Sequence, residues 1–340
     1  MTTAVHTVRR RMTRRVAWWW ARLAIAVATL AVLVWRVGTG PFLDGLHTVD
    51  ATALAAGAGI ALLTTVCSAW RWKVVARGLG VELPLGTAVA AYYRSMFLNV
   101  TLPVGVVGDV HRGISHGRDT RDVGRGLRAV AWERSAGQAV QLVITVTLLL
   151  VLPSPVRGDM PFVALVLVAA AAGVALMARV RPTAGGSRWA RLRSAGARDL
   201  REALLAPRAW PAIALASALA VAGHAATFLI AARTAGATAP PSRLLPLALL
   251  VMLAAVLPNV GGWGPREGVT AWAFAAIGLG ASLGVATAVV YGVMLFVACL
   301  PGAVILVAAW VQRTRSERWL RRPLPGGRAI PARQDGGADV

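Results

Sequence analysis

The chain has 340 residues, 57% of them hydrophobic, yet it carries 36 Lys and Arg against 14 Asp and Glu, for a formal net charge of +22. The apolar residues gather in long runs and the basic residues flank those runs. This arrangement argues against a soluble enzyme with a carboxylate-lined cleft and against a basic nucleic-acid-binding domain. It indicates an all-α polytopic integral membrane protein.

Apolar runs of about 20 residues, the length that crosses a bilayer as a helix, occur at six places. They cover residues 16–35, 51–70, 129–152, 160–178, 210–232 and 283–311. The first run follows several arginines and opens with Trp18, Trp19 and Trp20, which favours an uncleaved membrane anchor over a cleaved signal peptide.

The basic residues predict the orientation, because cytoplasmic loops hold an excess of Lys and Arg. Most of them lie at the N-terminus, in 71–82, in 111–128, in 179–209 and after 311. We therefore expect a bacterial cytoplasmic-membrane protein with both termini in the cytoplasm. It divides into a basic N-terminus (1–15), a transmembrane domain (16–311) and a basic, disordered tail (312–340).

Two further apolar segments are too short or too interrupted to be simple spans. Both neighbours of 84–110 are basic and cytoplasmic, so this segment enters and leaves by the same face, with a break near Asn99 and Pro103. The segment 244–280 is broken after Pro258, and each of its halves has about 14 residues, too few to cross. We expect two re-entrant broken-helix hairpins beside the full spans.

The two hairpins align with each other at an offset of 155 residues. Leu98, Leu102, Pro103 and Gly113 then match Leu253, Leu257, Pro258 and Gly268. The same offset carries the spans that flank the first hairpin onto predicted spans that flank the second. The sequence thus predicts inverted-topology repeats, about 51–152 and 206–307, as in many secondary transporters.

Ionisable residues at membrane depth cost at least about 2.5 kcal/mol each and call for a partner or a purpose. Those near the hairpins are Arg94, Asp109, Arg112, Glu133, Arg134, Arg266 and Glu267. The arginines outnumber the carboxylates by one, which suits an anion such as a lipid phosphate. Glu133 and Arg134 are helix neighbours pointing about 100° apart, so we expect each to pair across the bundle with Arg112 or Asp109.

The second hairpin offers a half-helix N-terminus. Gly261 and Gly262 precede Pro265, and a helix is expected from Arg266, so free backbone N–H groups would face an approaching anion. In the alternative interpretation, Arg266 and Glu267 pair with residues of the other hairpin and only hold the bundle together.

A metal site is a weaker hypothesis. Asp109, His111, His116, Asp119 and Asp122 are close in sequence, but their spacing is irregular for metal ligands. We expect no metal and no cofactor. The motifs of serine hydrolases, phosphate-binding loops and dinucleotide-binding domains are missing, so we expect no enzyme and assign no catalytic residue.

The motifs resemble a known membrane family. The stretch from Arg94 to Pro103, followed by Asp109, Arg112 and Glu133, is similar to the first half of the membrane region shared by lysylphosphatidylglycerol synthases and flippase-like proteins. The second half of that pattern is matched by Leu257, Pro258, Gly261, Gly262, Gly264, Arg266 and Glu267. The resemblance implies a role in translocating or handling lipid. Aminoacylation of lipid is not expected, because no segment after 311 suits an aminoacyl-transferring domain.

Three hypotheses follow. In the first, the protein moves an anionic phospholipid or a polyprenyl-phosphate lipid between leaflets. In the second, it is a non-transporting membrane partner of a glycosyltransferase or lipid-modifying enzyme. The third is an intramembrane glycosyltransferase using Asp44, Asp50 or Asp159. The substrate-binding residues expected for the first are Arg94, Asn99, Asp109, Arg112, Glu133, Arg134, Gly261, Gly262, Arg266 and Glu267, with Pro103 and Pro258 shaping the hairpin tips.

Overall fold

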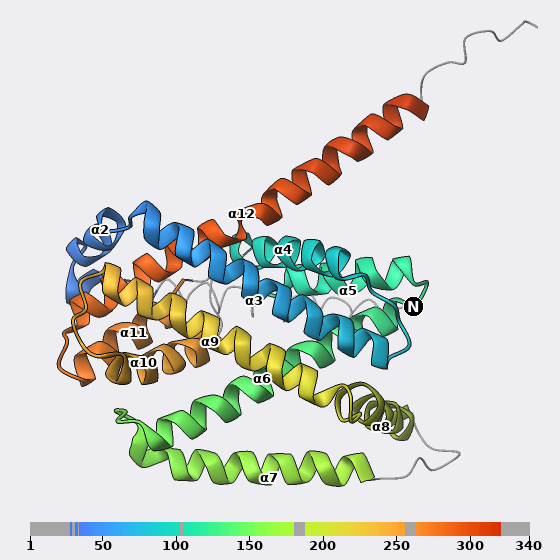
Figure 1. Ribbon diagram of the computed structural model, residues 1–340, viewed down its shortest axis with the longest axis horizontal. Helices are drawn as coiled ribbons and strands as arrows, with labels where there is room; N and C mark the ends of the chain where they lie inside the picture. Colours follow the sequence, from blue (N-terminus) through green and yellow to red (C-terminus); the bar gives the residue numbers. More distant parts are fainter. Residues whose placement is uncertain are drawn as a thin grey trace, which may run out of the picture.

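The computed structural model describes residue 28 and residues 31–32, 34–102, 105–179, 188–255 and 263–320, without the side chains of 177–179, 188–193 and 313–320. In this part of the chain every regular element is a helix, which confirms the predicted all-α class. The long helices lie across one another as a bundle, with α7 along one edge (Figure 1).

The helices follow one another with short connections. In chain order they are α2 (Gly40–His47), α3 (Ala51–Gly78), α4 (Leu85–Thr101), α5 (Val107–Asp119), α6 (Val123–Val151), the 3-10 turn η1 (Arg157–Asp159), α7 (Met160–Arg179), α8 (Arg188–Asp199), the π-helical turn η2 (Leu200–Leu204), α9 (Trp210–Thr234), α10 (Pro241–Ala254), α11 (Pro265–Ala276) and α12 (Ala281–Leu320).

Among the described residues, five helices are long and apolar enough to cross a membrane: α3, α6, α7, α9 and α12. They coincide with five of the six predicted spans. The first predicted span, 16–35, lies mostly outside the described residues. Two of the helices begin at an aspartate whose side chain accepts a backbone N–H of the first turn, from Ala53 for Asp50 and from Arg125 for Asp122. Such caps fix where α3 and α6 start.

The two segments expected to be broken are each a pair of shorter helices. α4 packs against α5, and α10 packs against α11. The pairs lie toward opposite ends of the bundle (Figure 1). The predicted tip residues Pro103 and Pro258 lie outside the described residues. In the first pair, Gly108 allows α5 to approach α4, because a Cβ there would stand 2.1 Å from the carbonyl oxygen of Ser95.

Three long helices, α3, α9 and α12, pack together in the bundle. α3 lies along α9, and α12 contacts α2, α4, α9 and α11. The largest apolar cluster joins α9, α10, α11 and α12, where Phe228 meets Phe274 and Tyr291 edge to face. These contacts hold the short helices α10 and α11 in place.

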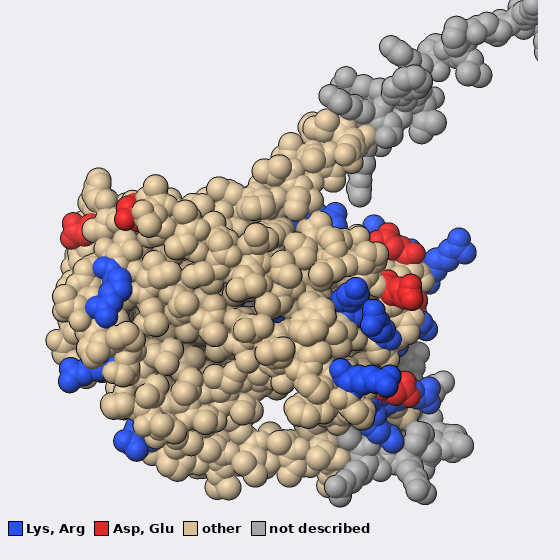
Figure 2. All heavy atoms as spheres, viewed as in Figure 1, with Lys and Arg blue, Asp and Glu red and all other residues tan. Residues whose placement is uncertain are grey.

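Charge is distributed along the bundle as the sequence predicts. Basic side chains crowd the end where α5 and α8 lie, while the middle of the visible face is almost free of charge (Figure 2). Three helices run further than predicted. α3 continues to Gly78 instead of ending at 70, and α6 begins at Val123 instead of 129. α12 continues to Leu320, although the sequence predicts a disordered tail from 312; residues 321–340 lie outside the described part.

Candidate functional site

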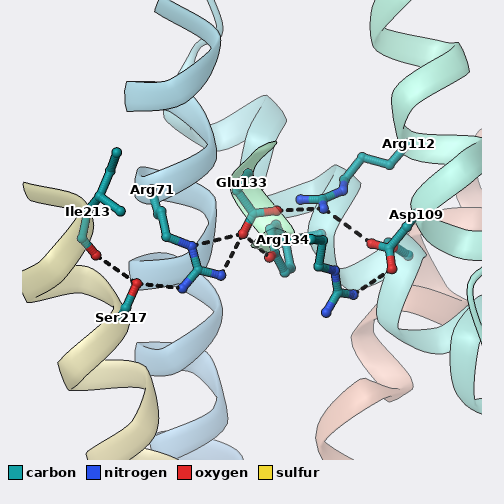
Figure 3. Close-up of polar contacts among 9 residues, drawn as sticks. Arg71, Asp109, Arg112, Glu133, Arg134, Ile213 and Ser217 are labelled. Carbon is teal, nitrogen blue, oxygen red and sulfur yellow. Dashed lines mark hydrogen bonds and ion pairs between the residues drawn. The ribbon is translucent and has the colours of Figure 1, made fainter. Parts of the chain in front are cut away.

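A fully buried glutamate lies at the centre of the polar site. Glu133, on α6, has its Oε1 atom 3.0 Å from Nε of Arg71 and 2.8 Å from the hydroxyl of Tyr92, both of which donate to it. Its Oε2 atom accepts a hydrogen bond of 2.9 Å from Nη2 of Arg112. Arg71 and Arg112 thus approach the carboxylate from opposite sides (Figure 3).

A second carboxylate, Asp109, lies in the first turn of α5. Its Oδ2 atom accepts a 2.6 Å hydrogen bond from Nη2 of Arg134, and its Oδ1 atom accepts one of 3.2 Å from Nη2 of Arg112. Ser95 and Asn99 of α4 also donate to Asp109, at 3.0 and 3.1 Å. Asn99 in turn accepts the backbone N–H of Gly108. The polar side chains therefore fasten α5 to α4 beside the helix break.

We call these linked side chains the Glu133 network. It joins five helices, α3, α4, α5, α6 and α9. The link to α9 is a hydrogen bond of 3.0 Å from Nη1 of Arg71 to the hydroxyl of Ser217, and that hydroxyl donates to the carbonyl of Ile213 (Figure 3). Its members are Arg71, Tyr92, Ser95, Asn99, Asp109, Arg112, Glu133, Arg134 and Ser217. The prediction that Glu133 and Arg134 pair with Arg112 and Asp109 is confirmed.

The sequence predicts that Arg71 belongs to the basic cytoplasmic segment 71–82, and this prediction is wrong. α3 continues for two more turns past residue 70, so the Arg71 side chain is buried and paired with Glu133. The available signal is that Arg71 stands between Trp70 and Trp72, so the apolar run does not stop at the arginine.

Arg112 is packed between two aromatic rings. Its guanidinium carbon lies 4.1 Å from the ring centroid of Tyr92 and 4.5 Å from that of Trp72. Such cation–π contacts are strongest where the cation is desolvated, and Arg112 is buried. Two carboxylates and two rings thus fix its position.

The second hairpin holds a separate charged pair. Nε and Nη2 of Arg266 donate to Oε1 of Glu267 at 2.9 and 2.6 Å, and Oε2 of Glu267 accepts the backbone N–H of Gly264 at 2.7 Å. Trp263 and Tyr291 lie beside the guanidinium. The interpretation in which this pair bonds to the other hairpin is wrong: Glu267 folds back to cap its own helix, which brings its carboxylate within reach of the adjacent arginine.

The structure therefore brings some predicted residues together and leaves others apart. Asn99, Asp109, Arg112, Glu133 and Arg134 form one network. Within the described ranges, no hydrogen bond or ion pair joins this network to Arg266 and Glu267, which differs from the single central site expected from sequence. Arg94 lies on α4, half-buried, at the edge of the network. Gly261 and Gly262 lie outside the described residues.

Several of the acidic and histidine residues considered for a metal site make other contacts. Among the residues described, no group of three or more His, Cys, Asp or Glu side chains could hold a metal ion. Asp122 caps α6 and pairs with Arg125, and the ring of His116 packs against Trp72 with centroids 5.2 Å apart. Asp50, one of the carboxylates considered for a glycosyltransferase, caps α3.

Long apolar helices around buried arginine–carboxylate pairs define a polytopic membrane protein with an ionisable polar centre. The chain belongs to the family of the lysylphosphatidylglycerol synthase TM region, whose model matches residues 19–320. This confirms the resemblance found in the sequence. No curated protein matches the chain.

Proposed function

We propose that the protein translocates or handles an anionic lipid, a phospholipid or a polyprenyl-phosphate lipid, between the leaflets of the bacterial cytoplasmic membrane. The observation that carries the proposal is the Glu133 network itself: three arginines and two carboxylates held where the first hairpin breaks. The family to which the chain belongs is named for a lipid-related membrane region.

The energetics of the network favour a functional role. Replacing a buried ion pair by well-packed apolar side chains is often neutral or stabilising, so packing alone does not explain why Glu133 is charged and completely buried. In the membrane, an ionisable group costs more still and commonly lines a substrate or proton path. The surplus of arginine over carboxylate would attract an anionic headgroup.

The helix bounds support the proposed inverted repeat. Adding 155 to the bounds of α3 gives 206–233, against 210–234 for α9, and adding it to α4 gives 240–256, against 241–254 for α10. The same shift moves α5 to 262–274, against 265–276 for α11. With the basic end of the bundle in the cytoplasm, the first hairpin would open to the inner leaflet and the second to the outer leaflet.

Liposome reconstitution tests this function directly. The full chain is reconstituted with fluorescent phosphatidylglycerol, and bleaching by external dithionite reports how much labelled lipid reaches the outer leaflet. With the wild type, we expect dithionite to bleach more labelled lipid than the outer leaflet holds at the start. The variants Glu133→Gln and Arg266→Ala should slow the movement of labelled lipid to the outer leaflet. Glu82→Gln, at an exposed glutamate, is the matched control and should leave it unchanged. Absence of translocation for every anionic lipid, or full rates in Arg266→Ala, would contradict the proposal.

A second candidate function is a membrane partner of a separate glycosyltransferase or lipid-modifying enzyme. It is favoured by a recess at the basic end of the bundle, between α3, α6 and α8, lined by Arg77, Arg125, Arg128, Arg198 and the carboxylates of Asp199 and Glu202. Substituting Arg77 and Arg198 with Gln would separate the two functions: a partner protein should lose support of its enzyme in isolated membranes, whereas a flippase should keep translocating lipid.

A further inference from the structure

A small recess lies between α3, α4 and α5 and shares Arg112 with the Glu133 network. Trp72 lines it from α3, Thr87 and Arg94 from α4, and Arg112 and His116 from α5. Trp72, Arg112 and His116 are each at least nine-tenths buried. Three of the side chains in the wall of the recess are therefore already removed from water.

These side chains leave nitrogen atoms without partners. Among the described residues, Nε1 of Trp72, Nε of Arg94, Nε and Nη1 of Arg112 and Nε2 of His116 are buried and make no hydrogen bond. They are five of the eight such side-chain atoms in the described part of the chain, and all belong to residues that line this one recess. Buried polar atoms in native proteins are nearly always hydrogen-bonded, so five in one place call for partners that the described side chains do not supply.

The chemistry of the nitrogens identifies the ligand as an anion. Trp72, Arg94 and Arg112 can only donate hydrogen bonds, and the two arginines are cationic. Nη2 of Arg112 already donates to Asp109 and Glu133, whereas Nε and Nη1 of Arg112 have no hydrogen-bond partner among the described residues. The donors lie on three helices and outnumber the two oxygens of a carboxylate. They suit a phosphate, which offers more oxygens as acceptors.

We propose that the recess between α3, α4 and α5 binds a phosphate group. Asp119, an exposed carboxylate at its rim, opposes the anion and would limit affinity. The recess is also lined by Leu83, just before α4, and Ser115, in the last turns of α5. A phosphate carried by a lipid headgroup is the source expected there, and this choice of source rests on the proposed function.

Binding to the full chain in dodecyl maltoside tests the proposal, with inorganic phosphate and dihexanoyl phosphatidic acid as probes in isothermal titration calorimetry. We expect both probes to bind and to compete with each other. Trp72→Phe keeps a ring beside Arg112 and removes only the indole N–H, and Arg94→Gln removes one charge; each should weaken binding about tenfold or more, as for a lost hydrogen bond to a charged group. Asp119→Asn should tighten it.

Arg118→Gln is the matched control, because Arg118 is an exposed arginine of the same helix α5 that does not line the recess. It should change affinity less than about twofold. Tighter binding of phosphatidic acid than of phosphate supports a lipid source, and the reverse order supports free phosphate. Absence of binding by both probes, or equal affinity in wild type, Trp72→Phe and Arg94→Gln, overturns the proposal.

The outcome is separable from that of the proposed function. Phosphate binding that depends on Trp72 and Arg94, without lipid translocation in liposomes, would leave the recess established as an anion site and refute the flippase. Translocation with no phosphate binding in the recess would refute the site alone. A thermal unfolding curve for each variant confirms that the comparison is made between folded proteins.

Discussion

Neutralising Glu133 should destabilise the protein more than any other single amide-for-acid change in the network. In Glu133→Gln, the amide oxygen best replaces Oε1, which accepts from both Arg71 and Tyr92. The amide nitrogen then faces Nη2 of Arg112, so two hydrogen-bond donors oppose each other where a 2.9 Å ion pair stood. Arg71 and Arg112 remain buried without their shared counter-charge.

The magnitude follows from that geometry. Removing one partner of a buried ion pair costs about 3–5 kcal/mol, because the remaining charge stays desolvated. By the scaling for soluble domains, this corresponds to a fall in melting temperature of roughly 10 °C. Glu82→Gln makes the same chemical change at an exposed site and should shift the melting temperature by less than about 2 °C.

The assay is thermal unfolding of the full chain in detergent, followed by tryptophan fluorescence. A double-mutant cycle with Arg112→Gln adds a sharper test: the combined variant should be less destabilised than the sum of the single variants by about 0.5–3 kcal/mol, because the opposed donors are gone. If the melting temperature of Glu133→Gln equals that of the wild type, or if the effects in the cycle are strictly additive, Glu133 does not stabilise the buried Arg71 and Arg112.

Two further predictions concern packing and orientation. Gly302→Ala should destabilise the fold by about 1–3 kcal/mol, since a Cβ there would lie 2.2 Å from the backbone carbonyl oxygen of Tyr93, whereas Gly59→Ala, with open space around it, should not destabilise. Chemical or thermal melts compare the two variants. The predicted orientation is tested in a variant that lacks the two native cysteines. A cysteine introduced at position 157 should react with a membrane-impermeant maleimide on intact cells, and one introduced at position 118 should react only after lysis. Labelling of both positions on intact cells would contradict the predicted orientation.

Much of the architecture is visible in the sequence, because the membrane imposes simple rules. Apolar runs of bilayer length predict α3, α6, α7, α9 and α12, and proline with glycine predicts that two segments are broken. The direction in which neighbouring helix residues point predicts that Glu133 and Arg134 seek different partners. These inferences depend only on local geometry and on the cost of exposing polar groups to lipid.

The partners that lie far apart in the sequence are harder to predict. Arg71 has the same basic character as Lys73 and Arg77, which follow it, and only the continuation of α3 through this position places its guanidinium beside Glu133. Glu267 is the opposite case: the alternative interpretation of its sequence places its partner on the other hairpin, whereas in the structure it accepts the backbone N–H of Gly264 in its own helix cap. Charge counting along the chain does not distinguish such cases.

The sequence by itself determined that this is a polytopic α-helical membrane protein of a lipid-related family, with most of its basic residues gathered in connecting segments and a few at depth. Only the tertiary structure decided which of those few meet, and that one recess collects the unpartnered nitrogens of Trp72, Arg94, Arg112 and His116. The physical reason is that span length and charge bias are properties of single segments, whereas the burial of a charge depends on how separate helices pack against it.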